Sequence, residues 1–196
     1  MDDWTERQSE IVDQAIRLIS EKGIQGMTVR SLARRIGVSE PALYRHFESK
    51  TDILLGILTR FEQSSLDSGA MPGLAESSGL DQIEEFFLAT LSRFQRRPEI
   101  AAVIFAEEIF QNEPRLSEKV ADIMRKHQEA LLGLLTRGQA CGEIRSDVNA
   151  RSLGLLIQGG KRLLVSRWRI SGHDFDLVAE GREFIGVLRT LLAVKK

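Results

Sequence analysis

The 196-residue chain contains only one cysteine, Cys141. A single cysteine excludes an internal disulfide and a zinc site built from several cysteines. The first ten residues, MDDWTERQSE, are acidic and hold no apolar segment of the kind that a secretion signal needs, so we expect no such signal. The longest apolar runs, such as AAVIFA and ALLGLL, fall far short of the roughly 20 residues that span a bilayer. We therefore expect a cytoplasmic protein with no membrane partner.

The chain also lacks a large excess of charge and lacks strand patterns. Its 27 Lys and Arg residues nearly balance its 28 Asp and Glu residues, for a net charge of −1. Any nucleic-acid site must therefore be a local basic patch. Period-two alternation of apolar and polar residues is nearly absent, whereas apolar residues at helical spacing dominate. The sequence predicts an all-α protein.

Capping residues and apolar spacing predict where the helices lie. The first should run from Thr5 to Lys22, and a capping residue should start each of the next three. These are a helix over 28–36 capped by Thr28, a very short one capped by Ser39, and one over 50–65 opened by Ser49 and Asp52. Later helices are predicted near 80–97, 98–112, 114–141, 147–171 and 174–194, with N-caps at Asp147 and Asp174 and stops at Gly142 and Gly172. The stretch 64–79, rich in Gly, Ser and Pro, reads as a loop.

Two short helices joined by GVS, residues 37–39, have the dimensions of a helix-turn-helix. In that motif the second helix enters the major groove of DNA, and donors around it bind phosphates. Six basic and two acidic residues between positions 22 and 50 give this segment a charge of +4. Such a local excess is typical of a phosphate-binding surface, although an ordinary solvated face is the alternative.

The stretch TVRSLARRIGVSEPALYRHFESKTDILLGIL, residues 28–58, closely resembles the helix-turn-helix of TetR-type (TetR/AcrR) transcriptional regulators. The resemblance implies a helix-turn-helix domain over 1–50 and a larger helical domain for ligand binding and dimerisation over 51–196. It implies phosphate contacts for Thr28 and Lys50. It implies that the DNA-binding residues are Thr28, Arg30, Ser39, Pro41, Ala42, Tyr44, Arg45, His46 and Lys50. His46 has packing as an alternative role.

The last two predicted helices carry more apolar surface than a monomer needs. The apolar residues of the last helix spread over roughly 200° at helical spacing, whereas a surface helix needs a stripe only about 100° wide. The resemblance implies a homodimer through these two helices. The candidate interface residues are Leu155, Leu163, Phe184, Leu188 and Leu191. A monomer with two buried terminal helices is the alternative.

Five of the nine phenylalanines lie between residues 86 and 110. Aromatic residues with a few polar anchors are typical of small-molecule pockets, although phenylalanine at helical spacing is also typical of a core. The candidate pocket residues are Phe87, Leu91, Phe94, Phe105, Glu108, Met124, His127 and Gln158. We expect a small hydrophobic or cationic effector, the latter if Glu107 or Glu108 contacts a cation; the alternative is that these carboxylates are solvated.

No catalytic or cofactor motif accompanies these features. The residues three before His46, His127 and His173 are Leu43, Met124 and Ile170, so the Glu-x-x-His pattern of di-metal bundles is absent. Phosphate-loop and dinucleotide fingerprints are absent as well. The sequence predicts no enzyme, no cofactor and no metal. The resemblance implies a ligand-responsive regulator that binds a palindromic DNA operator as a dimer. Repression is the commonest outcome in the family, and activation is the alternative that the sequence leaves open. The alternative is an architectural or protein-interaction protein that binds DNA without an effector.

Overall fold

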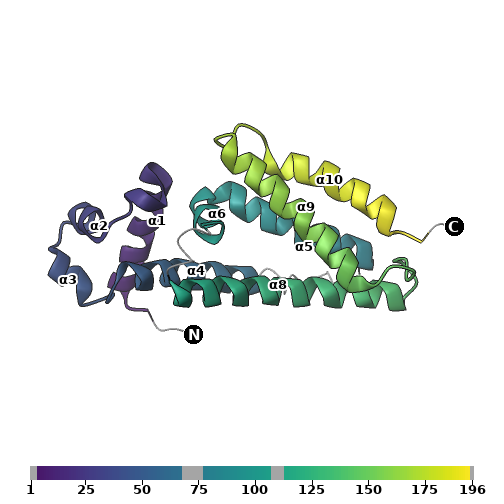
Figure 1. Ribbon diagram of the computed structural model, residues 1–196, viewed down its shortest axis with the longest axis horizontal. Coiled ribbons are helices and arrows are strands. Elements are labelled where there is room, and N and C mark those ends of the chain that lie inside the picture. The colour runs from purple at the N-terminus through teal and green to yellow at the C-terminus, as the bar shows by residue number, and fades with distance from the viewer. Residues whose placement is uncertain (1–3, 68–76, 107–112, 195–196) are drawn as a thin grey trace. The chain divides into compact units, whose positions relative to one another are not determined.

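The computed structural model describes residues 4–67, 77–106 and 113–194. The described part is helical, apart from an isolated antiparallel bridge between Ile144 and Ala193, so the predicted all-α class is confirmed. None of the described helices is long and apolar enough to cross a bilayer. In chain order the helices are α1 (Glu6–Gly26), α2 (Val29–Ile36), α3 (Glu40–Tyr44), α4 (Lys50–Asp67), α5 (Gly79–Arg96), α6 (Pro98–Ile104), α8 (Pro114–Ala140), α9 (Ala150–Ile170) and α10 (Leu177–Leu192) (Figure 1).

The chain divides into two compact units. Unit 1 comprises residues 1–64 and 97–122, and unit 2 comprises residues 65–96 and 123–196. Unit 1 therefore holds α1, α2, α3 and α6 with most of α4, and unit 2 holds α5, α9 and α10. Helix α8 begins in unit 1 and belongs to unit 2 from residue 123 onward. The functional boundary at residue 50 stays a prediction.

Unit 1 is built around α1, which starts with a capping box between Thr5 and Gln8. One face of α1 is fully buried, and it packs against α2 and α6. The buried residues of α1 are Ile11, Val12, Ala15, Ile16, Leu18 and Ile19. Near its end, Gly23 takes a φ of 70°, which glycine adopts without strain, and this kinks the helix before its last turn. The helix thus breaks beside the predicted stop at Lys22 and resumes as far as Gly26.

Unit 2 depends on the close packing of α10 against α5 and α9, which run side by side (Figure 1). The three helices share a core of large apolar side chains, among them Ile83, Phe87, Leu91, Ile157, Leu164, Trp168, Leu177 and Ile185. Glycine permits the closest approach of α9 to α10. A Cβ atom on Gly160 would lie 2.1 Å from Cζ of Phe184, and that ring is itself stacked on Phe87 at 5.8 Å.

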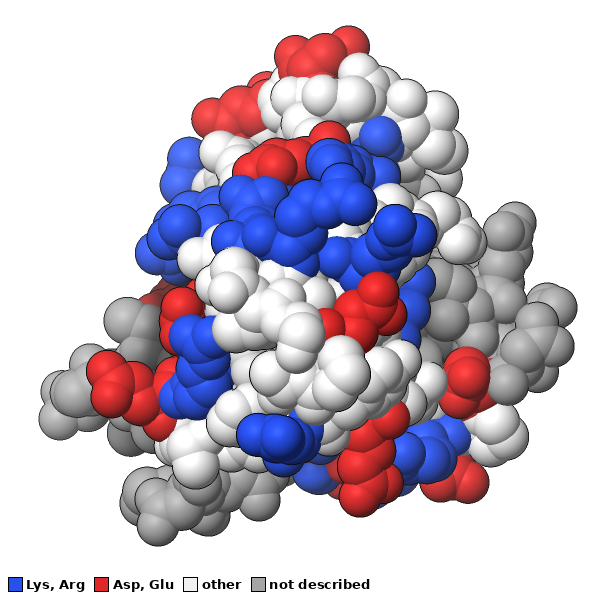
Figure 2. All heavy atoms as spheres, turned by 90° about the vertical axis from the view of Figure 1, so that its left-hand side faces the viewer, with Lys and Arg blue, Asp and Glu red and all other residues white. Residues whose placement is uncertain are grey.

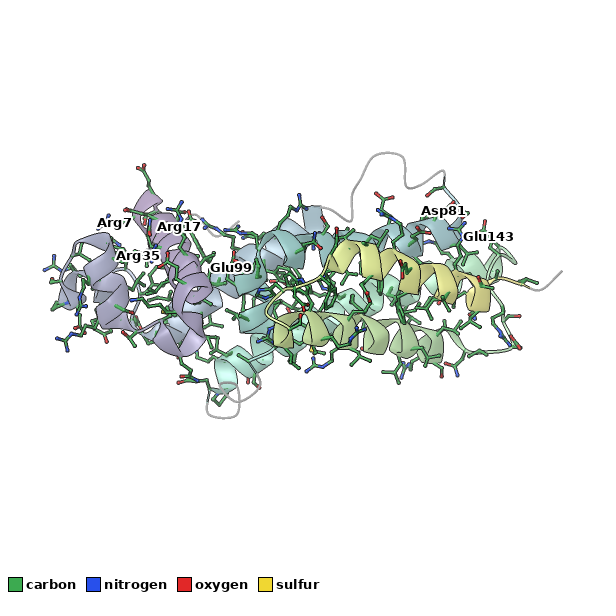
Figure 3. The ribbon with its side chains drawn as sticks, turned by 90° about the horizontal axis from the view of Figure 1, so that it is seen from above. Arg7, Arg17, Arg35, Asp81, Glu99 and Glu143 are labelled. Carbon is green, nitrogen blue, oxygen red and sulfur yellow. The ribbon has the colours of Figure 1, made fainter. Side chains whose placement is uncertain are left out.

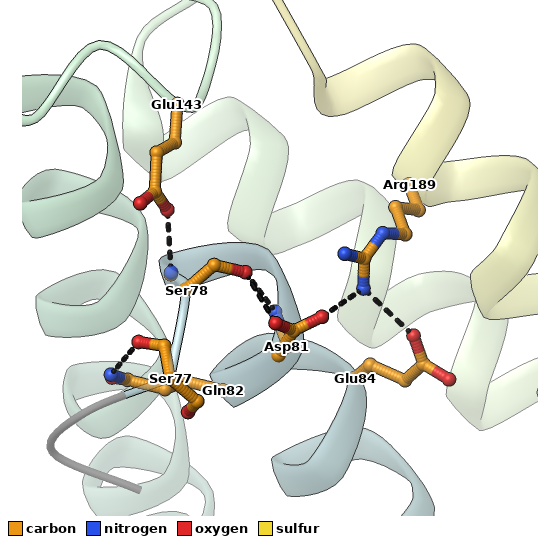
Figure 4. A network of polar contacts seen from close by, with 8 residues as sticks. Ser77, Ser78, Asp81, Gln82, Glu84, Glu143 and Arg189 are labelled. Atoms are coloured by element: carbon orange, nitrogen blue, oxygen red, sulfur yellow. Dashed lines mark hydrogen bonds and ion pairs between the residues drawn. The ribbon is translucent and has the colours of Figure 1, made fainter.

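A polar network fastens the start of α5 inside unit 2 (Figure 4). Ser78 caps the helix through Asp81, whose carboxylate also lies 2.5 Å from the guanidinium of Arg189 on α10. The same guanidinium lies 3.1 Å from Glu84, one turn further along α5. The backbone N–H of Gly79 donates to Glu143 in the loop that follows α8. The hydrogen bond from Ser78, followed by that from Arg189, lowers the pKa of Asp81.

Several predicted helix boundaries are wrong. Helix α9 is capped by Asn149 rather than Asp147, because the carboxylate of Asp147 pairs with Arg145 at 2.5 and 2.7 Å. Helix α10 is capped by Asp176 rather than Asp174, since Asp176 accepts bonds from two backbone N–H groups.

The remaining predicted boundaries have mixed outcomes. Helix α6 ends at Ile104 and not near residue 112. The predicted stops Gly142 and Gly172 are confirmed as left-handed residues just after α8 and α9. Most of the predicted loop over 64–79 lies outside the described residues.

Substituting Gly160 tests the packing of α9 on α10. We expect Gly160→Ala to lower the free energy of unfolding by about 1–3 kcal/mol, because the new methyl overlaps the Phe184 ring. Urea unfolding followed by circular dichroism measures the change.

The matched control is Gly133→Ala on α8, where a Cβ would meet only the flexible end of Arg137 at 3.4 Å. There alanine should raise the stability by up to about 1 kcal/mol through its helix propensity. Equal effects of the two substitutions would show that the close approach at Gly160 is not tight.

Candidate nucleic-acid interface

Residues 28–44 of unit 1 form the predicted helix-turn-helix. The Thr28 side chain accepts the N–H of Ser31 at 3.0 Å, and Ser31 reciprocates, so α2 starts where the sequence predicts. Helix α2 ends at Gly37, whose φ of 77° lets its N–H reach the carbonyls of the last turn. The Ser39 side chain then accepts the N–H of Ala42 and starts α3. The turn between the two helices is therefore as short as a helix-turn-helix requires.

Apolar residues on the inner faces of the two helices hold the motif together. Leu32 and Leu43 are buried completely or nearly so, and Ala33 is buried beside them. Phe47, just beyond α3, is also buried and meets the ring of Trp4 edge-on at 6.4 Å. Leu43 is the residue of α3 that packs into this core, and the exposed residues of α3 are left for polar contacts.

The predicted DNA-binding residues differ in exposure. Those that stand exposed on unit 1 are Thr28, Arg30, Ser39, Pro41, Tyr44 and Arg45. Those that are half-buried are Ala42, His46 and Lys50. Tyr44, the one tyrosine of the chain, is 46% exposed despite its large ring. An exposed aromatic with a hydroxyl beside an exposed Arg45 can donate to phosphates or bases.

A basic band surrounds this face. Figure 2 looks onto the side of the molecule where α2 and α3 lie, and it shows Lys and Arg side chains gathered there. Among the described residues, no carboxylate lies within ion-pair distance of Arg30, Arg34 or Arg45, and all three are exposed. These guanidinium groups are therefore available to a polyanion.

Arg35, which is labelled in Figure 3, differs from its neighbours because its guanidinium is already paired. It donates to both carboxylate oxygens of Glu21 at 2.6 and 2.7 Å, and to the side chain of Gln14 at 3.0 Å. The hydrogen bond from Arg35 lowers the pKa of Glu21 and correspondingly raises that of Arg35. Arg35 thus links α2 to α1. Its position beside Arg34 in the sequence does not reveal this structural role.

Lys50 and His46 both make contacts inside unit 1. The ammonium of Lys50 donates to the carbonyl of Ile24 at 3.2 Å, and burial lowers its pKa. Lys50, the first residue of α4, therefore contacts the kinked end of α1 and stabilises it. The carbonyl of His46 accepts a bond from Gln8, while its ring stays half-buried. The sequence did not indicate the contact between Lys50 and Ile24, because these residues are far apart in the chain.

The predicted pocket residues are divided between the two units. In unit 2, Phe87, Leu91 and Phe94 are buried in the core, and Gln158 is half-buried. Met124 is 52% exposed on α8. Phe105 belongs to unit 1, and Glu108 lies outside the described residues. The pocket stays a prediction.

Two further features of unit 2 are not among the sequence predictions. An open pocket of about 530 Å³ lies between α5 and α10. It is lined by Asp81, Glu84, Glu85, Leu88, Ala89, Ser92, Val178 and Arg182. The second feature is Lys161, which is buried on α9 at 8% exposure. The sequence does carry a signal for this burial. Lys161 stands four positions from both Ile157 and Val165, so it falls in the middle of an apolar stripe of the helix.

The predicted dimer residues separate into two sets on α9 and α10. Leu155, Leu163 and Leu191 are exposed apolar side chains, at 68%, 62% and 57%, and Leu188 is half-buried. Phe184 instead packs inside its own unit, against Phe87 and over Gly160. Large exposed leucines gathered on two adjacent helices are typical of an interaction surface.

Comparisons with known proteins agree with this geometry. Residues 11–57 match the family described as bacterial regulatory proteins, tetR family. Residues 74–190, more than half of the chain, match the family described as YsiA-like protein, C-terminal region. The chain is 25% identical over 184 residues to the fatty acid metabolism regulator protein of Bacillus subtilis (strain 168), covering 91% of this chain and 92% of that protein.

Two solved structures share the fold. The fatty acid degradation regulator FadR from Bacillus halodurans matches with a TM-score of 0.82 and 20% identity, over 94% of this chain and 95% of that one. FadR from Bacillus subtilis, solved in complex with stearoyl-CoA, matches with a TM-score of 0.76 and 23% identity, over 95% and 98%. Because family models match both the helix-turn-helix and most of the remaining helices, the chain belongs to the TetR family of bacterial regulatory proteins and is a DNA-binding transcriptional regulator.

Proposed function

We propose that the protein is a repressor that binds a palindromic operator as a homodimer and is released from it by a small-molecule effector. The observation that carries this proposal is the exposed basic surface around α3, set on a capped helix-turn-helix in a chain of the TetR family. A repressor acts on DNA, and we therefore expect the protein in the cytoplasm.

In this proposal α3 enters the major groove of the operator. Its small first residues, Ser39, Pro41 and Ala42, allow the backbone of the helix to approach the bases closely. Tyr44 and Arg45 follow on its exposed side. Thr28 and Lys50 begin α2 and α4, where helix N-termini favour a phosphate. For Lys50 this requires the ammonium to leave the carbonyl of Ile24 or to share its donors between the two.

One helix-turn-helix reads only a few base pairs, so the proposed repressor needs two. A two-fold dimer presents two reading helices to half-sites about 34 Å apart, or a multiple of that distance. The exposed leucines on α9 and α10, Leu155, Leu163 and Leu191, support these helices as the interface. Burying them against a second copy removes a large apolar area from water, which is the main driving force for association.

The effector in this proposal is an acyl compound with a long apolar chain. Support comes from the regulator of fatty acid metabolism that the chain resembles along most of its length, and from the stearoyl-CoA bound in a structure of the same fold. The effector binds one conformation of the dimer more tightly than the other and so shifts the population away from the DNA-binding state. The alternative, an architectural DNA-binding protein, would be indifferent to such compounds.

The first prediction concerns operator binding. In a mobility-shift assay at fixed salt, the wild type should bind DNA from upstream of its own gene, and Tyr44→Ala and Arg45→Ala should each weaken binding by about tenfold or more. Arg45→Ala should also reduce the dependence of affinity on salt by about one counterion.

Arg35→Ala is the matched control for Arg45→Ala. It removes the same charge from the same unit, but its guanidinium is already held by Glu21 and Gln14. Its affinity loss should be clearly smaller. Equal losses in the two variants would mean that only overall charge matters and that α3 does not read the DNA. Circular dichroism of each variant separates lost binding from lost folding.

The second prediction concerns the dimer. Leu163→Glu places a charge in the proposed interface, so we expect the dimer dissociation constant to rise by at least about tenfold, with a matching loss of operator affinity. Sedimentation over a concentration series measures the first effect. Met124→Glu, which alters a comparably exposed apolar residue on α8, should leave the dimer intact. A dimer that survives Leu163→Glu unchanged would rule out this interface.

A further inference from the structure

Helix α3 is too short to hold its own direction. It comprises five residues, Glu40–Tyr44, which is little more than one turn. Isolated helices shorter than about 12–15 residues are marginal in water, because the first turn fixes several backbone dihedral angles for a single hydrogen bond. The Ser39 side chain caps the start of α3, and Leu43 packs into the core of unit 1. Contacts just beyond the other end of α3 therefore have a large influence on the direction of the helix.

One such contact comes from the first turn of α1. The side-chain amide of Gln8 donates from Nε2 to the backbone carbonyl of His46 at 3.3 Å. Tyr44 is the last residue of α3, and Arg45 and His46 follow it directly. The hydrogen bond therefore holds the backbone at the point where the exposed Tyr44 and Arg45 leave the helix.

The other polar atom of the Gln8 amide is used in α1 itself. Its Oε1 accepts the backbone N–H of Thr5 at 3.0 Å, which closes the capping box at the start of α1. A glutamate would close the same box and would also interact favourably with the positive end of the helix dipole. Only an amide can in addition donate a hydrogen bond to a carbonyl. The contact with His46 is thus what distinguishes glutamine from glutamate at this position.

A second contact comes from Trp4, which lies just before α1. Its ring meets that of Phe47 edge-on, with 6.4 Å between the centroids. The same ring lies against α4 at Gly56, where an added Cβ would be only 3.0 Å from Cη2 of the tryptophan. The guanidinium of Arg60 lies over the Trp4 ring, 5.5 Å from its centroid, and pairs with Asp13 of α1 at 2.5 Å. Trp4 therefore joins the segment that follows α3 to both α1 and α4.

The two contacts come from outside the helix-turn-helix and end on adjacent residues, His46 and Phe47. Hydrogen bonds to bases require donor–acceptor distances of about 2.7–3.2 Å, so a small shift of α3 would break them. Attraction between basic side chains and phosphates acts over a longer range and tolerates such a shift. A change in the direction of α3 would therefore weaken sequence recognition more than general DNA binding.

We propose that Gln8 and Trp4 are positioning residues for operator recognition, which set the direction in which α3 presents Tyr44 and Arg45. This inference rests on the proposed function, since it assumes that α3 reads an operator. It adds two residues before and within α1 to a DNA-binding set that begins at Thr28 in the sequence.

The ratio of operator affinity to the affinity for unrelated DNA tests the proposal. The full chain is titrated at fixed salt with a labelled duplex that the wild type selects from random DNA, and with a scrambled duplex of the same length. Gln8→Glu keeps the capping box but cannot donate to His46, so the ratio should fall by about tenfold or more. The melting temperature should change little, because the helix dipole favours the new carboxylate and offsets the lost hydrogen bond.

Arg7→Gln is the matched control for Gln8→Glu, and Arg7 is labelled in Figure 3. It changes the net charge by the same amount at the neighbouring position. It removes a surface ion pair with Glu10, of a kind that contributes little to stability. Both variants should lose a similar share of affinity for the scrambled duplex, whereas Arg7→Gln should keep the wild-type ratio.

Trp4→Leu tests the second contact without a change of charge. It removes the ring that meets Phe47 and Arg60, so the ratio should fall about as far as in Gln8→Glu. The titrations are made well below the melting temperature of each variant. A residue that only stabilised the fold would then leave both affinities, and so their ratio, unchanged.

The proposal is overturned if either Gln8→Glu or Trp4→Leu keeps the wild-type ratio, or if Arg7→Gln lowers the ratio as much as Gln8→Glu. Those results would leave the proposed function standing, since the wild type would still prefer its operator. A wild type that selects no sequence from random DNA would overturn the proposed function and this proposal together.

Discussion

The exposed side of α3, with Tyr44 and Arg45, depends on the left-handed conformation of Gly37. With φ at 77°, the backbone N–H of Gly37 turns back to the carbonyls of Ala33 and Arg34, and this ends α2. Ser39 then caps α3 immediately, so only three residues separate the two helices. A residue with a Cβ would be strained at this position. The exposure of Tyr44 and Arg45 follows from this turn, because it directs Leu43 inward and leaves their side of α3 in solvent.

Unit 2 is organised by close packing and by a buried charge. Glycine lets α9 approach α10, and the polar network around Asp81 and Arg189 fixes the start of α5 against α10. Lys161 on α9 lies within this packed region at 8% exposure, with its ammonium 5.6 Å from the ring centroid of Phe86.

The sequence predicts those features of the structure that depend on residues close together in the chain, and it misses those that depend on distant residues. The starts of α2 and α3 and the stop at Gly37 are predictable, because each depends on residues within three positions. The caps of α9 and α10 are not, since Asp147 and Asn149 can both cap a helix and the ion pair from Arg145 decides between them. The contact of Lys50 with Ile24 depends on tertiary packing, which no local pattern encodes.

The most direct test of this account is selection from random duplex DNA with the purified full chain, followed by sequencing of the bound pool. The account predicts enrichment of two inverted half-sites whose centres lie about one helical turn, or a multiple of it, apart. Enriched positions that no side chain contacts would reflect the shape of the DNA. A bound pool with no sequence preference, retained only by charge at low salt, would contradict the claim that α3 reads an operator.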